Sequence, residues 1–268
     1  GVRSSALLLL TAAAITIALT ATSPLRLVGD GPEYLAMAQR ISRGSGPSLS
    51  TDDARAEGLE YRELRTSDGR QVLPHFWLYS AFVAPFMAGA RLLGLNEMVA
   101  FTWANAALLV ASACLAIQSF GAVTLAFLFL GPILWWIDKA HTEVFAYALL
   151  IAVSSQLSRR PTLALLAAGL LAAQNPQALV FFACVVPVIL LHLNRQEAAP
   201  GRVGLAVAGA VSCAMSYGGY YLWRIGRWTP LVEARDLRLP AIKTAGAVIW
   251  DLNIGLAIAA PLAVLVVA

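Results

Sequence analysis

The feature that most constrains this chain is a series of long apolar runs separated by short polar breaks. Hydrophobic residues make up 59% of its 268 residues and charged residues only 13%, whereas an ordinary soluble domain is about 25% charged. This composition excludes a water-soluble domain with a single core. We predict an all-α, polytopic helical membrane protein, in which the bilayer sets the helix lengths. The apolar runs cover residues 6–21, 76–94, 98–117, 120–137, 142–157, 162–174, 178–193, 203–223 and 245–268.

These runs predict eight or nine spans within a single transmembrane domain, residues 1–268. Several are shorter than the roughly 20 residues of a perpendicular crossing, so we expect tilted or half-spanning helices. Residues 6–21 suit either a first span or a signal peptide, and we favour a retained span because no small-residue cleavage site follows. The sequence begins with Gly1 and ends inside an apolar run, so we expect a C-terminal part of a longer protein to be missing.

The net charge of +4 comes from short basic clusters between the apolar runs. This placement indicates a positive-inside orientation signal, and we expect no nucleic-acid partner. Arg159 and Arg160 lie two spans before Arg195 and Arg202, which places all four on the cytoplasmic side with Arg3. Strict alternation from Arg3 would instead place Arg159 outside, so we expect one early segment not to cross fully.

One long polar segment, residues 22–75, holds seven arginines and eight of the 15 acids. It is too charged to lie in hydrocarbon and too long for a passive connector, so we predict an outer catalytic loop. A short amphipathic interfacial helix is predicted from Gly31, with Asp30 near its N-cap and Gly44–Pro47 ending it. On this topology the outer face also carries residues 138–143, 175–177 and 223–243.

The first candidate site lies at the start of that helix. Asp30 and Glu33 are three residues apart and share one helical face, which suits a general base with a supporting carboxylate, and Tyr34 follows them directly. The alternative is structural: Asp30 caps the helix and Glu33 closes a capping box.

The second candidate is the polar turn that follows two tryptophans. Asp138, His141 and Glu143 suit a phosphate-associated cation or a proton relay, and Lys139 suits direct pairing with phosphate. The His-x-Glu spacing lacks the i,i+4 relation of helical metal ligands, so we assign no metal ligands, although a divalent metal stays open as a cofactor. Alternatively, the turn is a solvated hairpin in which Thr142 caps the next helix.

Three weaker candidates are also polar. Asn175 and Gln177 flank Pro176 between two apolar runs, which fits a turn or a polar patch facing a substrate. His75 opens the second run after Pro74. A basic cluster suits a lipid phosphate, or simply headgroup binding and solvation, and consists of Arg224, Arg227, Arg235 and Arg238.

The order of these motifs resembles a known superfamily. The stretches GDGPEYLAMAQ (29–39), HFWLYSAFVAPF (75–86), DKAHTEVF (138–145) and QNPQALVFF (174–182) look like integral-membrane glycosyltransferases of the GT-C superfamily. The similarity is to the protein mannosyltransferase and lipid A aminoarabinose transferase branch, and more narrowly to uncharacterised bacterial members. It covers nearly all of the chain and implies a GT-C-like bundle.

The resemblance implies transfer of a sugar, with inversion, from a polyprenyl-phosphate donor to an unknown acceptor at the outer face of the bacterial inner membrane. Asp30 matches the loop acid taken as general base in the family. Glu33 departs from members with two adjacent acids, and His141 and Glu143 fall where the family lines its donor or acceptor pocket. Membrane lipid and a second subunit are the other partners considered.

Two other functions compete with this interpretation. A transporter or flippase of a lipid-linked saccharide would place ionisable residues at mid-bilayer and show related halves. Here the polar groups cluster at the ends of the runs, and the sequence shows no internal repeat. A non-catalytic membrane subunit, active only with a second polypeptide, is the third hypothesis.

Overall fold

The computed structural model describes residues 11, 25–121, 124, 132–195 and 199–230. All regular structure within these residues is helical, and extended segments pair only in isolated β-bridges. The all-α prediction is therefore confirmed for this part of the chain. Apart from residue 11, the predicted span 6–21 lies outside the described residues, as do the predicted span 245–268 and half of 120–137.

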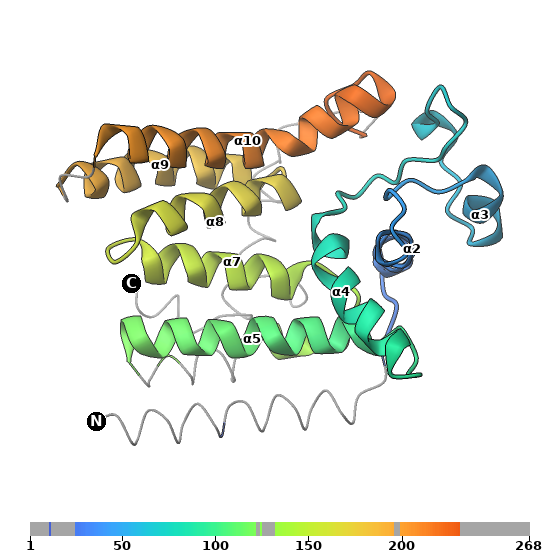
Figure 1. Ribbon diagram of the computed structural model, residues 1–268, viewed down its shortest axis with the longest axis horizontal. Coiled ribbons are helices and arrows are strands. Elements are labelled where there is room, and N and C mark those ends of the chain that lie inside the picture. The colour runs from blue at the N-terminus through green and yellow to red at the C-terminus, as the bar shows by residue number, and fades with distance from the viewer. Residues whose placement is uncertain (1–10, 12–24, 122–123, 125–131, 196–198, 231–268) are drawn as a thin grey trace, which may run out of the picture.

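Five of the described helices form a bundle with their long axes side by side (Figure 1). Helix α8 packs against α7, α9 and α10, and α7 also packs against α5. By length and composition α5, α9 and α10 are long and apolar enough to cross a membrane, whereas α7 and α8 are shorter apolar helices. The helices are α5 (Val99–Phe120), α7 (Glu143–Gln156), α8 (Pro161–Gln174), α9 (Ala178–Arg195) and α10 (Pro200–Ile225).

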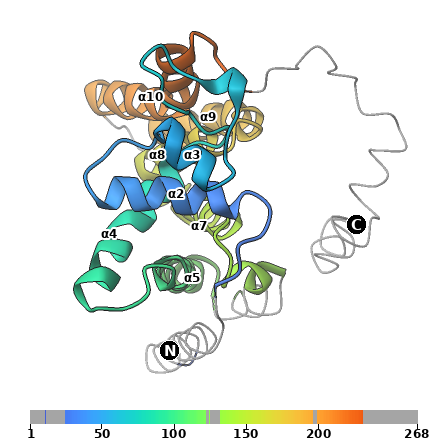
Figure 2. The same cartoon turned by 90° about the vertical axis from the view of Figure 1, so that its right-hand side faces the viewer.

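The remaining described elements gather at one end of the bundle, which we call the loop end. Figure 2 looks onto this end, with α2 lying across the bundle. Helices α7 and α9 begin at the loop end, and α8 and α10 finish there. The predicted interfacial helix is α2, which ends two residues before Gly44. The elements are α2 (Gly31–Ser42), α3 (Thr51–Ala56), η1 (Arg62–Leu64), α4 (Leu78–Leu92) and η2 (Pro132–Trp136).

The opposite end of the bundle carries arginines and is called the basic end here. Arg159 and Arg160 lie in the turn between α7 and α8, Arg195 ends α9, and Arg202 is in the first turn of α10. Arg159 donates a hydrogen bond to the carbonyl of Gln118 near the end of α5. The two basic clusters thus lie together, as the sequence predicted.

Helix α4 does not run alongside the bundle, although its sequence was predicted to form a span. It lies across the direction of α5, α7 and α8 (Figure 1). At its start, the Tyr79 amide donates to the Gln174 side chain at 2.8 Å. At its end, Arg91 donates to Ser42 at 2.8 Å and to Glu97 at 2.6 Å, which ties it to the end of α2 and the start of α5. Both ends of α4 are therefore held at the loop end.

The segment between α3 and α4 folds around a buried glutamine. The Gln71 side chain is 1% exposed. Its amide accepts from the Tyr61 N–H and donates to the carbonyls of Tyr61 and Val72. Leu49 forms a two-way backbone bridge with Gln71, and Ser50 caps α3 through the Asp53 N–H. Because these bonds satisfy buried polar groups, the loop has a fixed shape despite its charge.

Close backbone approach joins α8 to α10. A Cβ at Gly169 would lie 3.0 Å from the Ala210 Cα and closer still to its carbonyl oxygen. Only glycine permits this approach, because any side chain would push the two helices apart.

Candidate functional site

A cavity of about 710 Å³ opens at the loop end of the bundle. Its wall comes from the start of α2, the residues before α4, the first turns of α7 and α9, the last turn of α8, and α10. Most of the site residues predicted from the sequence line it. These are Asp30, Tyr34, His75, His141, Glu143, Asn175 and Gln177.

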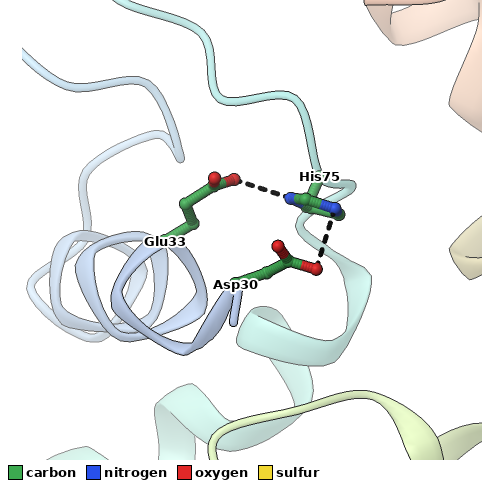
Figure 3. Close-up of side chains that lie close together, drawn as sticks. All are labelled: Asp30, Glu33 and His75. Atoms are coloured by element: carbon green, nitrogen blue, oxygen red, sulfur yellow. Dashed lines mark hydrogen bonds and ion pairs between the residues drawn. The ribbon is translucent and has the colours of Figure 1, made fainter. Parts of the chain in front are cut away.

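Asp30 stands at the entry to α2. Gly29 has a φ of +51°, which a glycine adopts without strain, and this turn leads the chain into the helix. Asp30 occupies the N-cap position, but its side chain makes no capping hydrogen bond. Its Oδ2 atom lies instead 3.1 Å from the His75 Nε2 atom (Figure 3). The carboxylate of Asp30 therefore faces the cavity instead of the helix terminus.

Glu33 lies behind this pair and is only 5% exposed. Its Oε2 atom is 2.7 Å from the His75 Nδ1 atom, and its Oε1 atom accepts a hydrogen bond from the Tyr61 hydroxyl at 2.5 Å. A buried carboxylate without partners would be costly, so these bonds explain how it is tolerated. Glu33 does not line the cavity. The structure shows it holding His75, with no capping-box contact.

His141 approaches Asp30 from the turn before α7. Its Nε2 atom lies 3.7 Å from the Asp30 Oδ2 atom, and its Nδ1 atom bonds the Glu143 carboxylate. His75 and His141 thus show the same arrangement, with one ring nitrogen toward Asp30 and the other on a glutamate. The ring of Tyr34 lies near both, with centroids 5.6 Å from His75 and 6.1 Å from His141.

Neighbouring charges control the protonation of the ring of His75. Burial of the ring disfavours its charged form, but the hydrogen bond to Glu33 and the charges of Glu33 and Asp30 outweigh burial, so the pKa of His75 is raised. The pKa of Tyr34 is raised mainly by burial and further by the same two carboxylates. The Tyr34 phenol therefore stays neutral beside Asp30.

Lys139 was predicted to meet phosphate, but the structure places it outside the cavity. Its Nζ atom donates to the Trp135 carbonyl, lies 4.0 Å from the Trp135 ring centroid and is 3.3 Å from Asp138. The guanidinium of Arg26 donates two hydrogen bonds, of 2.7 and 3.0 Å, to the same Asp138 carboxylate. Burial lowers the pKa of Lys139 despite the nearby Asp138. Asp138, His141 and Glu143 were predicted to act together, but only His141 and Glu143 line the cavity.

The polar turn between α8 and α9 contributes amides to the cavity, as the sequence suggested. Asn175 and Gln177 line the wall. Gln174 also lines it, and its side chain bridges to α4, donating to the Phe76 carbonyl and accepting from the Tyr79 N–H. This bridge is a tertiary contact across more than 90 residues, and no local pattern in the sequence indicates it.

Two further residues of the site were not predicted. Tyr217 of α10 lines the cavity, and Tyr61 supports Glu33 from the loop. Tyr217 belongs to a cluster with Tyr220 and Tyr221, and three tyrosines within five residues of an apolar helix are a signal that was available in the sequence. Tyr61 has no such signal.

The predicted basic cluster is only partly described. Arg224 lies 3.7 Å from Asp68 and 3.4 Å from the Ser48 hydroxyl, so it ties α10 to the loop. Arg235 and Arg238 lie outside the described residues.

One group of side chains in the described part of the chain has the spacing of a metal site. Asp30, Glu33 and His75 each offer a ligand atom, and these atoms lie within 4.8 Å of one another. The sequence had suggested a different group, Asp138, His141 and Glu143. The group in the structure joins α2 to the segment before α4.

The chain matches no known protein family, no curated protein and no solved structure at a significant level. Its site has to be interpreted from its own geometry.

Proposed function

We propose that this chain is an integral-membrane glycosyltransferase of the GT-C type, which transfers a sugar from a polyprenyl-phosphate donor to an acceptor, with inversion. One observation carries the proposal: a carboxylate held between two histidines faces a cavity whose wall becomes apolar away from it. Asp30 marks the polar rim, and Leu150, Leu171 and Phe181 belong to the apolar wall.

The two parts of the cavity match the two parts of a lipid-linked sugar. Glu143 and Leu150 lie on the same helix seven residues apart, which is about 10 Å along the axis. The rim offers hydrogen-bonding groups for a sugar and its phosphate, and the wall offers aliphatic and aromatic contact for the first isoprene units. A soluble sugar nucleotide would leave the apolar wall unused.

Asp30 supplies the base that such a transfer needs. The acceptor oxygen forms a bond to the anomeric carbon while the bond from that carbon to the phosphate oxygen breaks. The hydroxyl proton passes to the Asp30 carboxylate, and attack opposite to the departing phosphate gives inversion. General-base catalysis of this kind contributes roughly 10²- to 10⁴-fold in rate.

The arrangement of charge supports an active site on the outer face of a bacterial inner membrane. The basic end fits the cytoplasmic side by the positive-inside rule. Because α4 lies across the loop end, we do not count it as a crossing. The crossings before Arg159 are then the predicted span 6–21, α5, the predicted span 120–137 and α7. These four crossings bring Arg159 to the same side as Arg3. The conflict found in the sequence is then removed, and the cavity faces outward.

The test is Asp30→Asn, assayed for transfer from a radiolabelled polyprenyl-phosphate sugar with the full chain in detergent. We expect a loss of 10²-fold or more, since the amide has the same shape but cannot accept the proton. Asp52→Asn is the matched control, because Asp52 is an exposed acid of α3 away from the cavity. Full activity in Asp30→Asn would contradict the proposal. Lipid flux in proteoliposomes that needs no acceptor would contradict it as well.

A further inference from the structure

Two segments that are distant in the sequence pair with each other just before they enter the site. The N–H of Arg26 donates to the Asp138 carbonyl at 2.8 Å, and Arg26 forms a parallel β-bridge with Lys139. We call this pairing of Arg26 with Asp138 and Lys139 the junction. Asp30 follows Arg26 by four residues, and His141 follows Asp138 by three. A slip at the junction would therefore change the distance between these two site residues.

The two segments stay in close contact from the junction to the site. A Cβ at Gly29 would lie 3.6 Å from the His141 Nε2 atom. A Cβ at Gly31 would lie 3.3 Å from the Ala140 carbonyl oxygen. The absence of a side chain on either side of Asp30 lets the backbone come this near to the turn before α7.

Asp30 is held in place from two directions. After it, α2 packs against α4. Before it, the junction attaches the chain to the turn that precedes α7. The buried side chain of Asn105 in α5 fixes this turn by donating to the carbonyls of Ile137 and Lys139, each at 3.1 Å. Without the junction, Asp30 would be held only from the α2 side.

The ion pair in the junction does more than balance charge. The two hydrogen bonds from Arg26 to the Asp138 carboxylate fix its orientation as well as its distance. Lys139, whose side chain is 3% exposed, already brings a cation to 3.3 Å from the same carboxylate. Arg26 is 46% exposed, so its ion pair contributes little to stability. What Arg26 adds is a connection between segments 112 residues apart.

We propose that Arg26 and Asp138 are positioning residues of the transferase, whose ion pair holds the Asp30 carboxylate in register with His141 and Glu143. This inference rests on the proposed function, since it concerns the base of that reaction. A displacement of about 1 Å in a reacting group can cost about 100-fold in rate. Neither Arg26 nor Asp138 is among the described residues that line the cavity, so both act through the placement of Asp30.

The first test separates the chemical step from binding. Transfer from a radiolabelled polyprenyl-phosphate sugar is measured on the full chain in detergent, below the unfolding temperature of every variant. We expect Arg26→Gln to lower kcat about tenfold or more and to change KM less than about twofold. Arg26→Lys should recover part of the loss, because an ammonium replaces the charge but not the paired geometry.

The matched control is Arg65→Gln. Arg65 is 40% exposed and pairs with Glu60 inside the loop, so its ion pair does not join the two segments. We expect this variant to keep the kcat of the unsubstituted chain. Equal kcat values for Arg26→Gln and Arg65→Gln would overturn the proposal.

Asp138→Asn and the double variant with Arg26→Gln complete a cycle. If the two residues act through one ion pair, the double variant should lose no more kcat than the more affected single variant. Losses that multiply would overturn the proposal, because the two residues would then act independently.

A disulfide can replace the ion pair. A Cβ at Gly31 would lie 3.6 Å from the Ala140 Cβ, within the roughly 3.5–4.5 Å found in disulfides. Gly31→Cys with Ala140→Cys is introduced into a chain in which the three native cysteines are changed to alanine, namely Cys114, Cys184 and Cys213. Oxidation should then restore at least part of the kcat lost in Arg26→Gln, and reduction should remove the gain. A complete disulfide without any gain, in a chain that stays active on oxidation when Arg26 is present, would overturn the proposal.

The rate of disulfide formation needs no substrate and tells the two proposals apart. Arg26→Gln should slow the reaction of the two introduced cysteines severalfold, and Arg65→Gln should not. Slower formation in a chain that transfers no sugar would count against the transferase and leave the holding role of the junction standing. Equal rates with and without Arg26 would overturn that role, even in a chain that transfers sugar.

Discussion

Helices α5 and α9 have nearly the same mean hydropathy, 1.8 and 2.0, but very different surroundings. In α5, 56% of the most apolar window is buried inside the protein, against 11% in α9. Helix α5 packs between α4 and α7, whereas α9 packs mainly on α8. Apolar content therefore indicates that a helix avoids water, but it does not indicate whether protein or lipid covers it.

The largest effect that this comparison predicts is at Phe101 in α5, which is fully buried against Tyr79. Phe101→Ala should lower the free energy of unfolding by about 3–5 kcal/mol, since it removes a large buried side chain and leaves a cavity. Unfolding in mixed micelles, followed by circular dichroism, measures it. A loss below about 1 kcal/mol would mean that α5 is not a core helix.

A somewhat smaller effect is expected at Asn105, also in α5. Its side chain accepts from the Tyr79 hydroxyl at 2.8 Å and donates to the carbonyls of Ile137 and Lys139 at 3.1 Å. Asn105→Ala should cost about 2–3 kcal/mol because these buried partners lose their hydrogen bonds. The same micelle assay applies, with Gln118→Ala at an exposed position near the end of α5 as control. Equal stability of the two variants would contradict the expectation.

The turn that Asn105 holds should also make the stability of the fold depend on pH, through the carboxylate of Asp138. Burial opposes the charge of Asp138, but the hydrogen bonds from Arg26 and Lys139 prevail, so the pKa of Asp138 is lowered. A lowered carboxylate pKa stabilises the fold above the ordinary value near 4, and this stability is lost as pH falls through the folded pKa.

We therefore expect the free energy of unfolding to decrease as the pH falls below about 4, and only modestly, since Arg26 is partly exposed. Asp138→Asn should be less stable at neutral pH and lack this component of the acid-induced loss. Unfolding curves across the pH range measure it. Identical pH profiles for the two proteins would refute the role of this ion pair.

The smallest effect is expected on α9. Leu191 is 59% exposed, so Leu191→Ala should change the free energy of unfolding by less than about 0.5 kcal/mol. The measurement is the one used for Phe101→Ala. A loss of 2 kcal/mol or more would show that another protein surface, and not lipid, covers this side of α9.

Local signals in the sequence predicted the positions of the helices well. Pro32 in the first turn and Gly44 after the end correctly bracket α2, and Pro176 correctly marks the break between α8 and α9. The orientation of α4 was not predictable, because its apolar composition suits a span equally well. Its position depends on Gln174 and Ser42, which are distant in the sequence.

The site likewise contains residues that could be predicted from the sequence and residues that could not. Asp30 and His75 were selected because polar groups at the ends of apolar runs are unusual, and the structure brings them together. Lys139 satisfied the same criterion, but its side chain turns to Asp138 and Trp135. The sequence could not reveal this, since neighbouring residues in a turn point in different directions. The role of Tyr61 depends on a contact 28 residues away.

The bridge made by Gln174 limits how the protein can move. Its buried side chain holds the Phe76 carbonyl and the Tyr79 N–H, on either side of the start of α4 and next to His75. Swinging this segment away like a lid would leave a buried amide without partners, at a cost of about 1–3 kcal/mol. Opening the cavity at His75 therefore carries a cost that opening it elsewhere along its wall would not.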